Sequence, residues 1–122
     1  MSRDLLSAEA DLRLSEAAER MCAHDVGAML VLDGERLVGI LTERDVLRAV
    51  GEGAREGATV GDWMTRNPET IDPDETTKHA AILMIHGGFR HLPVTEGERV
   101  VGMLSIRDLM RIVLEDAVPG GG

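Results

Sequence analysis

GILTERD (residues 39–45) and GMLSIRD (residues 102–108) are two copies of one short motif, 63 positions apart (102 − 39). Each copy runs from a glycine through two apolar residues to a hydroxyl residue, with an aspartate three positions after the hydroxyl. Sliding the chain against itself by this interval pairs residues 7–50 with residues 70–113 without a gap, and 15 of the 44 pairs are identical. The sequence therefore predicts a tandem duplication.

Both copies predict the same order of elements, namely helix, β-hairpin, helix. Residues 14–22 and again residues 80–85 have apolar side chains at helical spacing, and an acid-rich stretch suited to a helix N-terminus precedes each. Two β-branched runs then flank Asp33-Gly34 in the first copy and Glu96-Gly97 in the second, which predicts a hairpin in each. The sequence also predicts closing helices, which the motif spacing places at residues 43–50 and 106–116.

Between these elements the sequence is less decisive. ETIDP (residues 69–73) is expected to form a short strand, and the Gly-rich residues 51–62 are interpreted as a connector. Neither copy is long enough to bury a core alone, so we expect an α/β fold in which the two share one. The predicted division is residues 1–57 for motif 1 with its connector, 58–117 for motif 2 and 118–122 for a flexible tail.

Composition and charge exclude several classes of function. A formal net charge of −9 opposes binding to nucleic acid and to anionic membranes. The apolar run of residues 80–85 is far too short to cross a bilayer, and the N-terminus lacks the apolar middle of a signal peptide. Because Cys22 is the only cysteine, no internal disulfide can form, and we expect a cytoplasmic protein.

Neither an enzyme nor a metal site is predicted. The paired glycines of the hairpins resemble a phosphate-binding P-loop in spacing, but the lysine that such a loop needs is absent. No nucleophile motif is present, and Cys22 is expected to be an inert thiol in the core. His79, His86 and His91 lack the spacing of a metal motif and are interpreted as solvated or capping residues.

The repeated hydroxyl–aspartate motif has two interpretations. In the first, Thr42 or Ser105 caps the following helix, and Asp45 or Asp108 returns a hydrogen bond to the cap amide. In the second, the same helix N-terminus binds a phosphate while the carboxylate accepts hydrogen bonds from ribose hydroxyls. Spacing alone favours the cap, and the two interpretations are compatible.

The two segments HDVGAMLVLDGERLVGILTERDVLRAV and GFRHLPVTEGERVVGMLSIRDLMRIV resemble the CBS domain, named after cystathionine β-synthase. The resemblance covers nearly the whole chain and implies a tandem, pseudo-twofold pair, the Bateman module, standing alone. It further implies a non-catalytic regulator that binds AMP, ADP, ATP or S-adenosylmethionine in clefts between the repeats. No cofactor is required, and occupancy would be signalled to an effector protein of unknown identity.

By this resemblance, Thr42 with Asp45 and Ser105 with Asp108 would contact phosphate and ribose. The second copy also carries basic residues, Arg90 and His91, at a position where related nucleotide binders face phosphates, whereas the first copy has Gly27 and Ala28. The backbone at Thr70 and Ile71 matches the segment expected to lie against adenine, with Ser7 and Ala8 as weaker counterparts. The site with Arg90, His91, Ser105 and Asp108 is therefore the first choice.

The predicted helices also indicate an interface. Residues 80–85 are apolar on every side of a helix, and Leu109, Met110 and Val113 form a wide stripe on the last helix. CBS pairs usually dimerise through such helices, so we expect a homodimer. The alternative is a ligand-free dimeric interaction module in which both hydroxyl–aspartate motifs are only helix caps.

Overall fold

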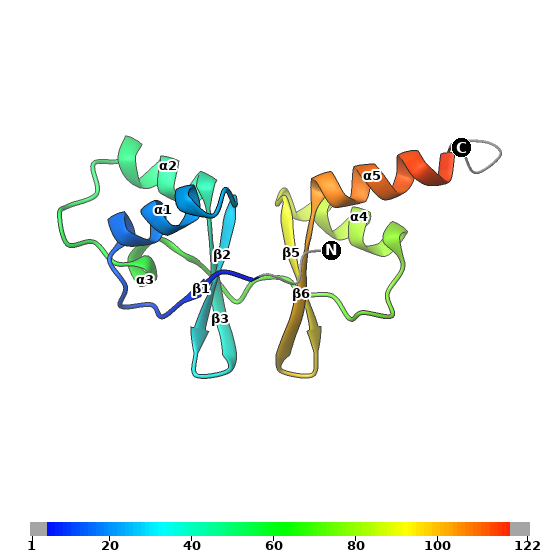
Figure 1. The fold of residues 1–122 in the computed structure, drawn as a ribbon, viewed down its shortest axis with the longest axis horizontal. Coiled ribbons are helices and arrows are strands. Elements are labelled where there is room, and N and C mark those ends of the chain that lie inside the picture. Colours follow the sequence, from blue (N-terminus) through cyan, green and yellow to red (C-terminus); the bar gives the residue numbers. More distant parts are fainter. Residues whose placement is uncertain (1–4, 118–122) are drawn as a thin grey trace. The chain divides into compact units, whose positions relative to one another are not determined.

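A β-hairpin with helices on one face is the unit of the fold, and the computed structural model, which describes residues 5–117, contains two of them (Figure 1). The first unit comprises Leu5–Pro68, and the second begins at Glu69. The expected α/β fold and the repeated order of helix, hairpin and helix are confirmed. The finer division at residues 57 and 58 stays a prediction.

The first unit is a four-stranded sheet with three helices. Its elements in chain order are β1 (Ser7–Ala8), α1 (Leu14–Ala23), β2 (Ala28–Asp33), β3 (Arg36–Thr42), α2 (Glu43–Gly51), α3 (Val60–Trp63) and β4 (Thr65–Arg66). The strands lie in the order β1-β2-β3-β4, with β1 parallel to β2 and the other neighbours antiparallel. The long β2–β3 hairpin is therefore the centre of the sheet.

The core of the first unit lies between that hairpin and the helices. Met29, Val31 and Leu41 come from one face of β2 and β3, as the two-residue period of a strand requires, and are fully buried. Leu14 and Met21 pack against them from α1. The helical spacing of the apolar residues thus produced the buried face that the sequence predicts.

The second unit repeats the design with fewer elements. It contains α4 (Thr77–Gly87), β5 (His91–Glu96), β6 (Arg99–Ser105) and α5 (Ile106–Ala117). The expected strand at residues 69–73 is reduced to a single parallel bridge between Ile71 and Val94. Its core is built from buried residues of the hairpin, of both helices and of the segment before α4: Ile71, Ala80, Met84, Leu92, Val94 and Leu109.

Both hairpins have the same irregularity at the same repeat position. Gly34 and Gly97 begin the two-residue turns with φ of 64° and 62°, a conformation in which a side chain is strained. The register shifts after Val31 in the first unit and after Val94 in the second, which leaves one extra residue on β3 and on β6. The repeat therefore extends to the backbone geometry.

Two expectations from the sequence are wrong. The segment expected to be a connector, residues 51–62, packs in the first unit: Ala58 and Val60 are buried in its core, and α3 begins at Val60. Backbone bonds from Leu14 N to Ala58 O and from Val60 N to Leu12 O, both 2.8 Å, hold the segment against the start of α1. These bonds make up for its low hydrophobicity.

Cys22 is the second error, because the structure places its thiol on the surface and not in the core. The buried face of α1 consists of Leu14, Ala17 and Met21, and one further residue turns the helix by about 100° away from it. Every helix within residues 5–117 is too short to cross a bilayer.

Candidate functional site

The start of α2 contains the predicted capping box. The backbone N–H of Thr42 donates to Asp45 Oδ2 over 2.9 Å, and the N–H of Asp45 donates to Thr42 Oγ1 over 3.3 Å. The Thr42 hydroxyl also donates to Oδ2 over 3.1 Å. The cap interpretation of the motif is therefore confirmed in the first unit.

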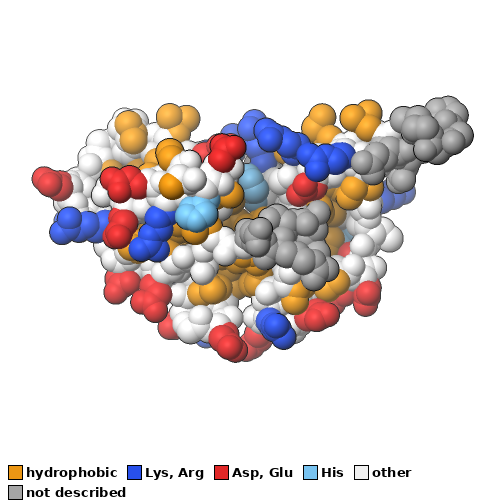
Figure 2. Space-filling model, in the orientation of Figure 1, with side chains coloured by type: hydrophobic (Ala, Val, Ile, Leu, Met, Phe, Trp, Pro, Cys, Tyr) orange, Lys and Arg blue, Asp and Glu red, His pale blue; other side chains and the backbone are white. Residues whose placement is uncertain are grey.

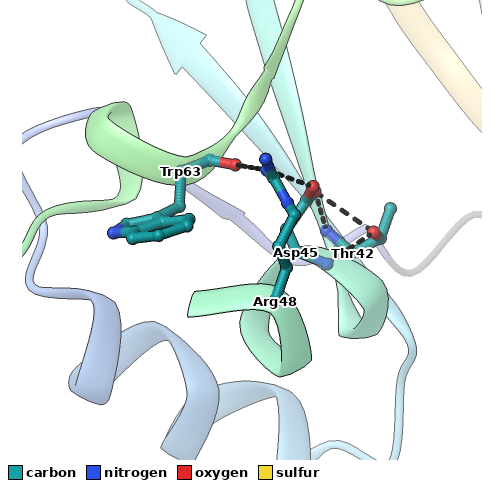
Figure 3. Close-up of polar contacts among 4 residues, drawn as sticks. All are labelled: Thr42, Asp45, Arg48 and Trp63. Carbon is teal, nitrogen blue, oxygen red and sulfur yellow. Dashed lines mark hydrogen bonds and ion pairs between the residues drawn. The ribbon is translucent and has the colours of Figure 1, made fainter. Parts of the chain in front are cut away.

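Asp45 has a second set of contacts in the first unit (Figure 3). Its carboxylate is the only buried charged group among the described residues, at 5% exposure. The guanidinium of Arg48 donates to Asp45 Oδ1 over 3.3 Å and to the backbone carbonyl of Trp63 over 3.2 Å. It also lies 5.4 Å from the centre of the Trp63 ring, a cation–π distance. Both oxygens of Asp45 are thus engaged by the protein.

The start of α5 contains the same box in the second unit. The backbone N–H and the hydroxyl of Ser105 both donate to Asp108 Oδ2 over 2.9 Å, and the N–H of Asp108 donates to Ser105 Oγ over 3.1 Å. Among the described residues, these hydrogen bonds reach only one oxygen of Asp108. The carboxylate is half-buried and not enclosed as Asp45 is.

The ionisation of Asp108 is fixed by opposing effects. Partial burial raises the pKa of its carboxyl, but hydrogen bonds from the backbone N–H and hydroxyl of Ser105 and the charge of Arg111 more than offset this. The pKa of Asp108 is therefore held below its ordinary value. The group is a carboxylate at neutral pH, the form that accepts hydrogen bonds from ribose hydroxyls.

The structure brings the basic residues of the second repeat to the same place. His91 lies directly opposite Ser105 in the β5–β6 ladder. The N–H of Ile106, the first residue of α5, donates to the carbonyl of Arg90 over 2.8 Å. Arg90, His91, Ser105 and Asp108 therefore gather at one helix N-terminus, and the Arg90 side chain is exposed there.

Thr70 and Ile71 lie beside β5, where Ile71 forms a parallel bridge with Val94. The Ile71 backbone is fully used, because its N–H donates to Pro93 O over 3.0 Å and its carbonyl accepts from Thr95 N over 2.8 Å. Its side chain is in the core, whereas the Thr70 side chain is exposed. Of this pair, only Thr70 has an exposed side chain.

Sequence reasoning missed Arg48 and Trp63. Their contacts join positions 15 residues apart and depend on α3. That helix has only four residues, too few for a helical periodicity to be seen in the sequence. A signal was present all the same, because Thr59 and Asp62 have the spacing of the two other caps. The Thr59 N–H donates to Asp62 Oδ2 over 2.9 Å, and hydrogen bonds from Thr59 lower the pKa of Asp62.

Comparison with known proteins identifies the family. The CBS domain matches residues 1–52 and 60–115. The chain belongs to the CBS domain family. As a CBS pair, it is 35% identical over 107 residues to an uncharacterized 17.7 kDa protein of Acidianus ambivalens, covering 86% of this chain and 65% of that protein. It spans between 42% and 65% of the length of three curated relatives that it matches.

Solved structures of other CBS proteins have the same fold. The CBS pair of MJ0100, in complex with 5′-methylthioadenosine and S-adenosyl-L-methionine, is 29% identical with a TM-score of 0.88 and covers 95% of this chain and 93% of its own. The CBS protein PAE2072 of Pyrobaculum aerophilum, complexed with AMP, is 28% identical with a TM-score of 0.85; the coverage is 94% and 92%. Both relatives bind adenosine compounds.

Proposed function

We propose that this CBS pair is a non-catalytic sensor that binds an adenosine-containing ligand and signals its occupancy to a partner protein. AMP, ADP, ATP and S-adenosylmethionine are the candidate ligands, and the proposed location is the cytoplasm. The binding of AMP and S-adenosylmethionine by CBS proteins of the same fold supports this class of ligand. The proposed ligand contacts are Arg90, His91, Thr70, Ser105 and Asp108, with Ile71 supporting Thr70. Thr42 and Asp45 occupy the positions of Ser105 and Asp108 in the first repeat.

One observation carries the proposal. The hydrogen bond from Ile106 N to the Arg90 carbonyl fixes the backbone of Arg90, an exposed residue, at the N-terminus of α5, where Asp108 is ionised. A helix N-terminus and a guanidinium together favour a phosphate, and an ionised carboxylate accepts hydrogen bonds from ribose hydroxyls. The ligand that matches both groups is a nucleotide.

A thermal-unfolding panel with AMP, ADP, ATP, NAD and S-adenosylmethionine tests the proposal. A ligand at 100 times its dissociation constant adds about 2.7 kcal/mol to the free energy of unfolding. In a domain of this size, each kcal/mol raises the unfolding midpoint by roughly 3–7 °C. We expect such a shift for at least one nucleotide of the panel with the unmodified protein, and none with Asp108→Ala.

The matched control is Asp62→Ala, which removes an aspartate with the same capping role at the start of α3. This variant is expected to keep the whole ligand-induced shift. If no ligand of the panel raised the unfolding midpoint of the unmodified protein, the nucleotide sensor would be contradicted. The alternative, a ligand-free interaction module whose repeated motifs are only helix caps, would then be favoured.

We further propose that the sensor forms a homodimer through its helices. Ile85 on α4 and Met110 and Leu114 on α5 are 73%, 60% and 63% exposed. Leu47 on α2, the repeat counterpart of Met110, is 73% exposed, and apolar side chains reach the surface over α2 and over α5 (Figure 2). Because each repeat presents the same apolar position, a second copy of the chain would match both patches.

A further inference from the structure

The two capping boxes are alike, but the residues around them differ in charge. The repeat counterpart of Arg90 is Gly27, and the counterpart of Ile106 is Glu43. In each unit these two positions meet through one backbone hydrogen bond, from Glu43 N to Gly27 O over 2.9 Å and from Ile106 N to Arg90 O over 2.8 Å. The contrast is therefore between equivalent places in the two units.

In the first unit, the space that a side chain on Gly27 would enter is taken by a carboxylate. A β-carbon added to Gly27 would lie 3.3 Å from both Cδ and Oε2 of Glu43. In the second unit, the same two positions are occupied by Arg90, which is exposed, and by the uncharged Ile106 at the start of α5. A phosphate approaching the start of α2 thus meets a negative charge, whereas one approaching α5 meets a positive charge.

The aspartates differ in the same direction. Asp45 has both oxygens bonded, because Thr42 occupies Oδ2 and Arg48 occupies Oδ1. Trp63 holds the Arg48 guanidinium in that position through its carbonyl and its ring. A ribose would have to displace Arg48 from a carboxylate that is 5% exposed. At Asp108, the hydrogen bonds from the Ser105 N–H and hydroxyl both reach Oδ2, and the carboxylate is half-buried.

From these contacts we infer that Glu43 and the Arg48–Trp63 pair close the motif of the first repeat to nucleotides, so that each chain binds one nucleotide, at Asp108. This inference rests on the proposed function and adds its stoichiometry and the residues that determine it. In the first repeat, Asp45 serves only to cap α2 and to bind Arg48.

Calorimetric titration with AMP tests the inference on the unmodified chain. We expect one AMP per chain. We expect Asp108→Asn to weaken the affinity by about 10- to 100-fold, the loss of a hydrogen bond to a charged group, and Asp45→Asn to change it less than twofold. Two AMP per chain, or binding that is lost in Asp45→Asn and kept in Asp108→Asn, would overturn the inference and leave the nucleotide sensor standing.

A chain that binds no AMP, ADP, ATP or S-adenosylmethionine would instead overturn the proposed function, and the inference with it. The stoichiometry of the unmodified chain decides even if Asp45→Asn does not fold. A gain-of-site variant completes the test: Gly27→Arg combined with Glu43→Ile and Arg48→Met gives the first repeat the charges of the second. We expect it to bind two AMP per chain, and a folded variant that still binds one would show that these residues do not close the motif.

Discussion

Leu41→Ala is expected to lower the free energy of unfolding by about 2–5 kcal/mol, the range for removing a buried leucine side chain. Leu41 is fully buried in the first core, between the hairpin and the helices. It is also the residue before Thr42, so its packing fixes the end of β3 from which α2 begins. Denaturant titration followed by circular dichroism measures the loss.

The repeat supplies the control for this prediction. Leu104 is the counterpart of Leu41 and precedes Ser105 in the same way, but its side chain is only half-buried. Leu104→Ala should therefore cost clearly less than Leu41→Ala, because less apolar area returns to water. Equal losses in the two variants would show that the first core is not packed as described.

Asp45→Ala is expected to lower the free energy of unfolding by about 1–3 kcal/mol, because it removes a buried carboxylate and leaves its part-buried donors without their acceptor. The Thr42 N–H loses its partner, and Arg48 loses the carboxylate that it binds. Asp108→Ala removes only a capping interaction at a more exposed position, for which about 0.5–2 kcal/mol is usual. Chemical denaturation of both variants without ligand compares them directly.

Which of the two variants loses more unfolding free energy shows which aspartate has the larger structural role. A larger loss for Asp45→Ala agrees with an aspartate that serves the structure of the first repeat. A larger loss for Asp108→Ala would contradict that assignment, since the half-buried aspartate would then be the more important structural group.

The repeated features were the part of the fold that the sequence could predict. Hairpins, helices and both caps depend on local signals, such as Gly34 at a turn and an aspartate three residues after Thr42, and each signal occurs twice. The duplication made these predictions secure, because a pattern that recurs at one fixed interval is seldom accidental.

The features that failed depend on contacts between distant positions. The Gly-rich segment before α3 is interpreted as a connector from its composition, but backbone hydrogen bonds to residues more than 40 positions earlier hold it in the first unit. Cys22 is apolar and lies next to Met21, but the sheet covers a narrower face of α1 than the sequence indicates. The arginine occurs in both repeats, as Arg48 and Arg111, so the repeat pattern gave no sign that Arg48 has a particular partner in Trp63.

The candidate site was predicted in outline. The meeting of Arg90 with the start of α5 follows from the strand register, which places His91 opposite Ser105. The difference between the two aspartates was beyond the sequence, because it depends on burial and on which carboxylate oxygen each donor reaches.

The most direct test of the central claim is a two-dimensional ¹H–¹⁵N NMR titration of the labelled protein with AMP. We expect the amide signals of Arg90, Ser105 and Ile106 to shift most, while those of their counterparts Gly27, Thr42 and Glu43 stay unchanged. Shifts centred on Thr42 and Glu43, or no shifts at saturating AMP, would contradict the central claim.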